Sequence, residues 1–95
     1  MSQAYVVGHI TVKDAEKWQQ YQARVPATLV PWGAQLVFRG QNVAVFSGAM
    51  PYSGIVVIRF ADVEAAEQWF HSDAYQALLP LRAQAADVVL TSYRA

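Results

Sequence analysis

Two stretches of the chain repeat the same order of apolar and polar positions. Residues 6–18 and residues 56–69 each contain an apolar, β-branched run, a short polar turn and an acidic segment that carries a tryptophan. The apolar runs are too short for buried helices and indicate strands, whereas the acidic segments are typical of helix starts. A strand–helix–strand unit used twice in residues 1–95 predicts one domain with a compact split βαβ sandwich.

Five segments have the composition of strands. They are residues 4–12, 35–39, 43–46, 55–61 and 88–93. Gly40-Gln41-Asn42 has turn chemistry, so a hairpin-like pair is expected from the second and third of these segments. Residues 48–54, which include Pro51, are predicted to form a loop.

Apolar residues at helical spacing predict a helix after the first strand. Its N-cap is Asp14, and its apolar stripe consists of Trp18, Tyr21, Val25 and Leu29. Pro26 lies inside this stripe and is expected to kink or narrow the helix. Pro31 and Gly33 are expected to end it.

The second half of the chain repeats the arrangement. A helix is predicted at residues 63–71, and a further helical stretch, interrupted at Pro80, at residues 72–86. Right-handed crossovers in a split βαβ arrangement place the helices on one face of the sheet. Strand alternation then assigns one set of side chains to that face: Val6, Gly8, Ile10, Val12, Val56, Ile58 and Phe60.

The opposite sheet face has no cover within one copy of the chain. It carries Tyr5, Val7, His9, Thr11, Ile55, Val57, Arg59 and Ala61. A largely apolar sheet face in water is uncommon on a monomer and usually marks an interface. We therefore expect a homodimer, paired sheet against sheet through Tyr5, Val7, His9, Ile55, Val57 and Arg59.

The composition supports an oligomer and narrows the choice of partners. Apolar residues make up 55% and charged residues 15% of the chain, against about 45–50% and about 25% in an ordinary soluble domain. The net charge is zero, which argues against nucleic acid or an anionic membrane as partner. The absence of cysteine excludes disulfides and thiolate chemistry. We find no leader pattern and no apolar stretch of about 18 residues, and expect a cytoplasmic protein.

A string of residues along nearly the whole chain resembles one family of small proteins. It consists of Tyr5-Val6-Val7, His9-Ile10-Thr11-Val12, Asp14, Tyr21, Gly33, Arg39-Gly40, Gly48, Phe60, Ala66, Trp69-Phe70, Ser72-Asp73-Ala74-Tyr75-Gln76 and Pro80-Leu81-Arg82. In this order the string is similar to the DUF1330 family. The resemblance implies an α+β, ferredoxin-like βα(β)ββαβ sandwich, with an antiparallel sheet, both helices on one face and pairing as a dimeric α+β barrel. The biochemical role of that family is largely unassigned.

The chain departs from the family pattern at two acidic positions. The family usually has Glu-Gly where this chain has Ser47-Gly48, and Glu-Phe where it has Arg59-Phe60. One carboxylate is therefore absent and the other is replaced by a cation. If relatives use those carboxylates for binding or proton transfer, this protein either acts differently or binds the opposite charge.

His9 and Arg59 occupy matching places in the two repeats and are the candidate catalytic pair. We expect them on adjacent parallel strands, with both side chains on the outer sheet face. A histidine titrates near neutral pH, and an arginine binds carboxylate or phosphate in a fork. Together they are suited to hold an anionic molecule, with the histidine as acid or base. The alternative is that both only set the register of the dimer.

A second group of residues predicts a ligand pocket between helices and sheet. Its candidate ligand-binding residues are Tyr21, Arg39, Trp69, Tyr75 and Arg82. Apolar walls with a few polar groups suit an aromatic or acyl substrate. The alternative is core packing, in which the phenol and guanidinium groups bond to loop carbonyls. Trp18 and Trp69 occupy equivalent positions in the repeat, which favours packing for both.

Other site chemistries find little support in the sequence. The two histidines lack the spacing of metal ligands, and neither a metal nor a cofactor is expected. His71 precedes the Ser72 cap and is expected to be exposed. Neither Ser47 nor Ser53 sits in a nucleophile elbow.

Three functions remain open. The first is a dimeric protein that binds a small organic, anionic or aromatic molecule without chemistry of its own. The second is a cofactor-independent enzyme, by analogy with monooxygenases, isomerases and cyclases among other dimeric α+β barrels. The third is a structural dimer without a ligand.

Overall fold

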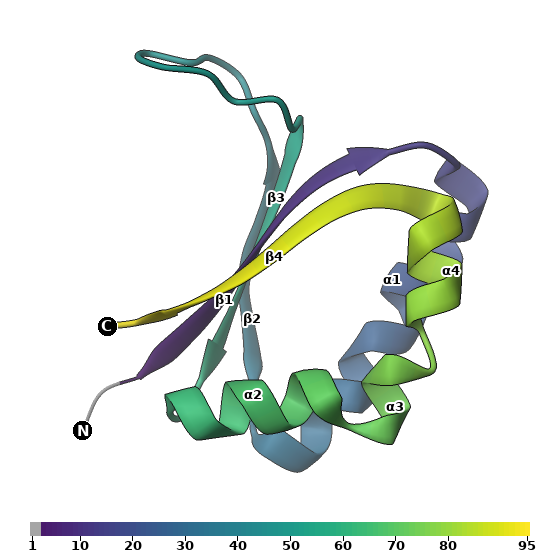
Figure 1. Cartoon of the computed structure of the whole chain (residues 1–95), viewed down its shortest axis with the longest axis vertical. Helices are drawn as coiled ribbons and strands as arrows, with labels where there is room; N and C mark the ends of the chain where they lie inside the picture. The colour runs from purple at the N-terminus through teal and green to yellow at the C-terminus, as the bar shows by residue number, and fades with distance from the viewer. Residues whose placement is uncertain (1–2) are drawn as a thin grey trace.

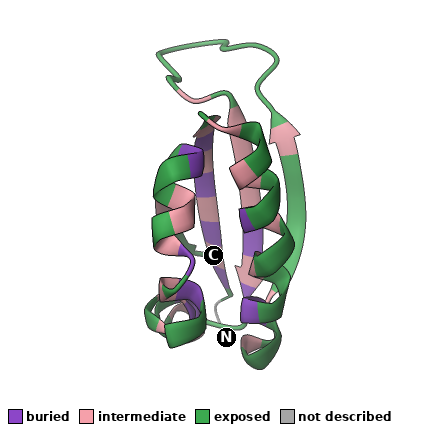
Figure 2. Cartoon of the chain, turned by 90° about the vertical axis from the view of Figure 1, so that its right-hand side faces the viewer, coloured by how far each residue is buried: buried purple, intermediate pink, exposed green. Residues whose placement is uncertain are grey.

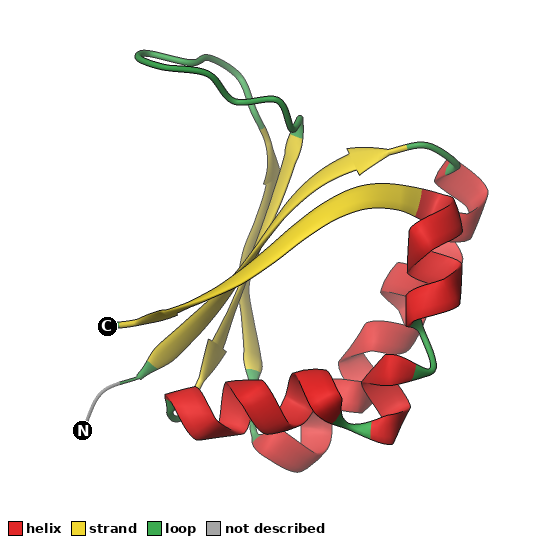
Figure 3. Cartoon of the chain, viewed as in Figure 1, coloured by secondary structure: helices red, strands yellow, loops and turns green. Residues whose placement is uncertain are grey.

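A four-stranded antiparallel sheet and a layer of helices make up the fold. The computed structural model describes residues 3–95. Its elements are β1 (Ala4–Val12), α1 (Ala15–Leu29), the short 3-10 helix η1 (Val30–Trp32), β2 (Gln35–Gln41), β3 (Gly54–Phe60), α2 (Val63–His71), α3 (Asp73–Gln76), α4 (Leu79–Ala85) and β4 (Ala86–Arg94). The strand order is β2-β3-β1-β4, and the helices lie on one face of the sheet (Figures 1 and 3). The predicted α+β class and helix placement are confirmed.

Equivalent aspartates start the main helix of each repeat. The Asp14 carboxylate accepts a hydrogen bond from the Lys17 backbone N–H at 3.1 Å, and Asp62 accepts one from Ala65 at 2.7 Å. These bonds satisfy backbone donors that have no partner within the helix. At the other end of the first helical segment, Gly33 adopts the left-handed conformation with φ 61° and ends η1.

The sheet differs from the sequence prediction in two respects. Residues 43–46 are not a strand but part of the loop 42–53, and the predicted turn residues Gly40 and Gln41 belong to β2. In this loop, the side chains of Val43 and Phe46 are 95% and 99% exposed, so neither is buried against the sheet. The strands β1 and β3 also run antiparallel rather than parallel.

The predicted helical stretch at 72–86 is divided by a turn. The Ser72 hydroxyl caps α3 by accepting from the Tyr75 N–H at 3.3 Å, as predicted. Pro80 lies in the first turn of α4, where a missing N–H costs nothing, so the proline begins a helix instead of interrupting one.

The core fills the space between the sheet and the helices at one end of the sandwich. Its largest fully buried side chains are Trp69, Tyr75 and Phe60. The indole N–H of Trp69 donates to the Thr28 hydroxyl at 3.0 Å and so joins α2 to α1. Figure 2 shows buried residues along the strands between the helices, whereas the loop 42–53 is mostly exposed.

The outer face of the sheet is free of helices. Three cross-strand rows lie on it: Gln35-Arg59-Tyr5-Tyr93, Phe38-Val57-Val7-Thr91 and Gly40-Ile55-His9-Val89. The middle row is apolar over three strands. Phe38 is 50%, Val89 39% and Tyr93 54% exposed, so large apolar side chains face solvent here in a single copy of the chain.

The hydrogen bond between Trp69 and Thr28 predicts which of two Thr28 variants is the less stable. Thr28→Val keeps the apolar volume but leaves the buried indole N–H without an acceptor, which we expect to cost about 1–3 kcal/mol of unfolding free energy. Thr28→Ser removes a methyl group but keeps the hydroxyl. Urea unfolding should therefore find the valine variant less stable than the serine variant. Burial of apolar area alone gives the opposite order, and that result would show the bond to be unimportant.

Candidate functional site

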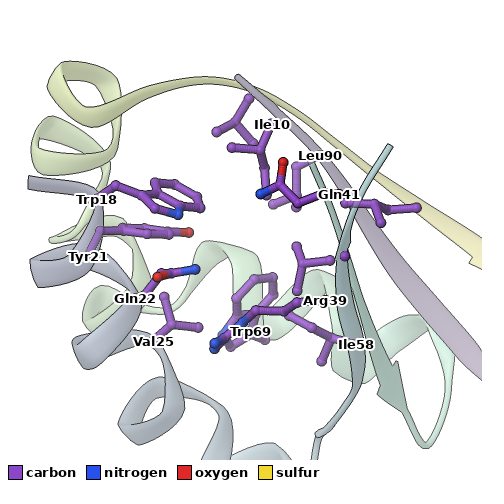
Figure 4. A pocket seen from close by; sticks show the side chains of 14 residues that line it. Ile10, Trp18, Tyr21, Gln22, Val25, Arg39, Gln41, Ile58, Trp69 and Leu90 are labelled. Atoms are coloured by element: carbon purple, nitrogen blue, oxygen red, sulfur yellow. The ribbon is translucent and has the colours of Figure 1, made fainter. Parts of the chain in front are cut away.

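A cavity of about 250 Å³ lies between α1 and the inner face of the sheet. In Figure 4 the side chains of Trp18, Tyr21, Gln22 and Val25 project from α1 toward the sheet. The opposite wall comes from all four strands, and Trp69 of α2 closes one side. The wall residues whose side chains lie on the inner face of the sheet are Ile10, Arg39, Gln41, Val56, Ile58, Val88 and Leu90.

A β-bulge turns two polar side chains of β2 toward this cavity. Leu36 pairs with Ile58 and Phe38 with Val57, so Val37 is an extra residue in β2. One extra residue exchanges the two faces for the rest of the strand. Arg39 and Gln41 therefore line the cavity, and Phe38 lies on the outer face. Without the bulge the strand would offer Phe38 to the cavity instead.

A chain of three polar side chains reaches the cavity from the helices behind it. The Tyr21 and Tyr75 hydroxyl oxygens are 2.7 Å apart, and Nη1 of Arg82 donates to the Tyr75 hydroxyl at 2.9 Å. Burial, followed by the adjacent Tyr75, raises the pKa of Tyr21 well above its ordinary range. Tyr21 is therefore a neutral phenol at physiological pH, and it can donate or accept a hydrogen bond.

Aromatic contacts fix the position of the Tyr21 ring. Trp18 stacks on it with ring centroids 5.0 Å apart and an interplanar angle of 24°. Tyr75 approaches it edge-on at 6.5 Å, and the Trp69 ring lies 4.2 Å from Tyr75. Because these rings restrain one another, the Tyr21 hydroxyl is held in place and points into the cavity (Figure 4).

The structure brings the residues predicted for a pocket into one region but gives them different positions. Tyr21, Arg39 and Trp69 line the cavity directly. Tyr75 and Arg82 lie behind Tyr21 and connect to the cavity through its hydroxyl. Sequence reasoning missed Gln22 and Gln41 and treated Trp18 as packing alone. Gln22 follows Tyr21 on the helix and could have been noticed, whereas Gln41 depends on the bulge.

His9 and Arg59 do not form a pair within one copy of the chain. Because β1 and β3 are antiparallel, His9 lies opposite Ile55 and Arg59 lies opposite Tyr5. Four residues along a strand separate the two positions, about 13 Å at the usual rise. Both side chains are on the outer face, away from the cavity. The His9 ring lies 6.2 Å from that of Tyr52, and the Arg59 guanidinium donates to the Gln35 side chain.

Two further expectations concern metal ligands and membrane association. Within residues 3–95, no three histidine, aspartate or glutamate side chains gather as metal ligands would. His71 is exposed, as predicted, and its ring packs edge-on against Phe70 at 5.2 Å. None of the helices in the described part of the chain has the length and apolarity that a membrane crossing requires.

Comparison with known sequences identifies a family model that covers nearly the whole chain. The family described as "Domain of unknown function (DUF1330)" matches residues 3–93. A search of curated proteins found no match.

Solved structures with the same architecture come from several bacteria. A protein of unknown function from Rhodopseudomonas palustris, RPA0582, has a TM-score of 0.82 at 14% identity over 99% of this chain and 82% of its own. SnoaB, described as a cofactor-independent oxygenase from Streptomyces nogalater, has a TM-score of 0.73 at 12% identity over 100% and 94%. A dimeric ferredoxin-like protein of unknown function from Jannaschia sp. CCS1 has a TM-score of 0.74 at 8% identity over 98% and 99%. These likenesses show the ferredoxin-like fold.

The raised pKa of Tyr21 predicts a loss of stability in alkali. Above the ordinary tyrosine value of 10.0, the folded protein keeps a proton that the unfolded chain releases. The free energy of unfolding should therefore fall as pH rises beyond about 10, by up to about 1.4 kcal/mol per pH unit. Tyr21→Phe should remove this component from urea unfolding curves measured across that range.

Tyr93 provides the control for the alkaline experiment. It is 54% exposed on β4 and takes no part in the Tyr21–Tyr75 pair. Tyr93→Phe should therefore retain the alkaline loss of the parent protein. If Tyr21→Phe and the parent protein lose stability in parallel as pH rises, the burial of the Tyr21 phenol is not what sets that loss.

Proposed function

Since the chain belongs to the DUF1330 family, whose role is unknown, we propose its function from the cavity itself: the protein binds a small organic molecule there. The observation that carries the proposal is the cavity with its mixed lining. The cavity of about 250 Å³ is open to solvent, and its lining combines aromatic and aliphatic side chains with Gln22, Arg39 and Gln41. Concave sites with such a lining are the usual places where small molecules bind.

The lining favours a flat, largely apolar ligand with a polar or anionic edge. Trp18, Tyr21 and Trp69 supply aromatic surface. Ligand pockets of this kind combine apolar walls with a few polar groups that fix orientation. Arg39 is exposed and also lines the cavity, so its guanidinium is suited to a carboxylate or another oxyanion at the mouth.

The protein is proposed to bind this ligand as a homodimer. The outer sheet face has a continuous apolar row, Phe38-Val57-Val7, and half-exposed aromatic or aliphatic side chains beside it. A second copy of the chain would cover this face through the same residues on both sides. In such a pair His9 and Arg59 would lie in the interface, so the alternative that they set its register is the one proposed.

A second candidate is a cofactor-independent enzyme that uses the same cavity. The observation in its favour is the Tyr21 hydroxyl, which is held at the cavity wall and linked to the Arg82 cation through Tyr75. His9 and Arg59 lie on the other sheet face, so a reaction in the cavity of the same copy would depend on Tyr21 and not on that pair. SnoaB shows that this fold can serve such an enzyme.

Binding of the dye anilinonaphthalene sulfonate tests the cavity. The dye is an aromatic anion, and its fluorescence rises in apolar surroundings. Val25→Trp places an indole in the cavity wall and should abolish the dye signal. Ala27→Trp adds the same side chain to the exposed face of α1 and should leave the signal unchanged. A signal that survives Val25→Trp would place the dye elsewhere, and the absence of any signal would contradict the binding proposal.

The proposed dimer predicts the effect of a charge on the outer sheet face. Val57→Asp would bury an unpaired carboxylate at the centre of the interface, so it should yield monomers or precipitate. Val30→Asp is the matched control, because Val30 is 75% exposed at the start of η1, away from the sheet. Sedimentation equilibrium distinguishes the species. A folded Val57→Asp dimer, or a monomeric parent protein, would contradict pairing through this face.

A further inference from the structure

The side chains of Arg82, Tyr75 and Tyr21 form a hydrogen-bonded series whose first step has a fixed direction. A guanidinium has donors and no acceptor, so Arg82 donates to the Tyr75 oxygen. The Tyr75 side chain is fully buried, at 0% exposure. A buried hydroxyl normally donates its own hydrogen, because leaving it unpaired is unfavourable.

Tyr21 is the acceptor that the Tyr75 hydroxyl hydrogen can reach. Within residues 3–95, the hydrogen-bond partners of the Tyr75 hydroxyl are Arg82 and Tyr21, and Arg82 cannot accept. Either hydroxyl can donate across the 2.7 Å contact, and the need to pair the buried Tyr75 hydrogen favours Tyr75 as the donor to the Tyr21 oxygen. The hydroxyl hydrogen of Tyr21 then forms no bond to Tyr75 or Arg82. Because the Tyr21 hydroxyl lies on the cavity wall, that hydrogen is available to whatever occupies the cavity.

From this geometry we infer that Tyr21 is a fixed hydrogen-bond donor and that the ligand of the cavity carries an acceptor oxygen at that point. The class of ligand is a flat aromatic molecule with a carbonyl group, such as an aryl ketone. This inference rests on the proposed binding function and adds the polarity of the group that the site recognises.

The Arg82 cation strengthens the donor as well as setting its direction. Hydrogen bonds in a series polarise one another, so the charge at Arg82 makes Tyr75, and then Tyr21, a better donor. Burial keeps Tyr21 protonated, because it raises the pKa of the phenol. Arg82 acts through the two tyrosines and is a positioning residue. A tyrosine without this arrangement could turn its hydroxyl to accept from a ligand, and the site would lose its preference.

Two probes that differ at one non-hydrogen atom test the inference. Acetonaphthone has a carbonyl oxygen, and isopropenylnaphthalene has a methylene group in its place with nearly the same shape. Titration calorimetry or NMR shifts should show the ketone binding about fivefold more tightly, the usual contribution of one neutral hydrogen bond. Val25→Trp should abolish the binding of both probes and so locate them in the cavity.

Substitutions at Tyr21 and Arg82 distinguish the effect of the hydrogen-bond donor on ketone affinity from the effect of packing in the cavity. Tyr21→Phe should bring the affinity of the ketone down to that of the hydrocarbon, while hydrocarbon binding persists and shows that the cavity is intact. Arg82→Met should reduce the ketone preference without changing hydrocarbon affinity. Arg82→Lys restores a donor-only cation and should retain part of the preference.

The outcomes distinguish this inference from the proposal on which it rests. If both probes bind the parent protein equally and Val25→Trp removes both, the cavity binds ligands but Tyr21 is not a fixed donor. A ketone preference that survives Tyr21→Phe also overturns the donor assignment. A preference that survives Arg82→Met overturns the role of the cation. If neither probe binds, both the binding function and the inference fail.

Discussion

Coverage of the sheet on one face only is the constraint on which this structure depends. A four-stranded sheet has two faces, and every helix of residues 3–95 lies on the same one. Side chains alternate along each strand, so a single set of strands must supply both a core and an uncovered surface. The inner face takes the buried side chains of Val6, Ile58 and Phe60, whereas the outer face keeps Val7 and Val57 only partly covered. The cavity and the proposed dimer interface are the two consequences of this division.

The cavity arises because the core is filled unevenly along the inner face. Trp69, Tyr75 and Phe60 occupy one end, where α2 packs on the sheet. At the other end, α1 faces the sheet across a space bordered by Trp18 and Val25. The bulge at Val37 adds a polar edge by turning Arg39 inward. A site with aromatic walls and a cationic mouth thus follows from where large side chains are present and where they are not.

Local signals predicted most of the fold, and pairing between distant segments explains what was missed. The bounds of β1 and the capping roles of Asp14 and Ser72 could be predicted, since each depends on neighbours in the sequence. Similarity between the repeats suggested parallel strands, but strand direction depends on how the connecting segments return to the sheet. The bulge at Val37 has no local signature, because it exists only relative to β3. The five residues predicted for a pocket lie in one region of the fold, but the sequence could not show that Tyr75 and Arg82 lie behind Tyr21.

The polar chain behind Tyr21 also explains why the cavity need not be apolar throughout. In the described residues, no buried side-chain nitrogen or oxygen lacks a hydrogen-bond partner, so Tyr75 and Arg82 are satisfied without a ligand. The free-energy cost of removing the polar groups of Tyr75 and Arg82 from water is offset by these hydrogen bonds. If Tyr75 donates to Tyr21 as proposed, only the Tyr21 hydrogen is left for an occupant of the cavity, and water can accept it when no ligand is bound. A ligand that displaces this water without offering an acceptor forfeits that bond, whereas a carbonyl oxygen replaces it. The selectivity of the site would therefore come from a single hydrogen atom whose direction is set by a cation two side chains away.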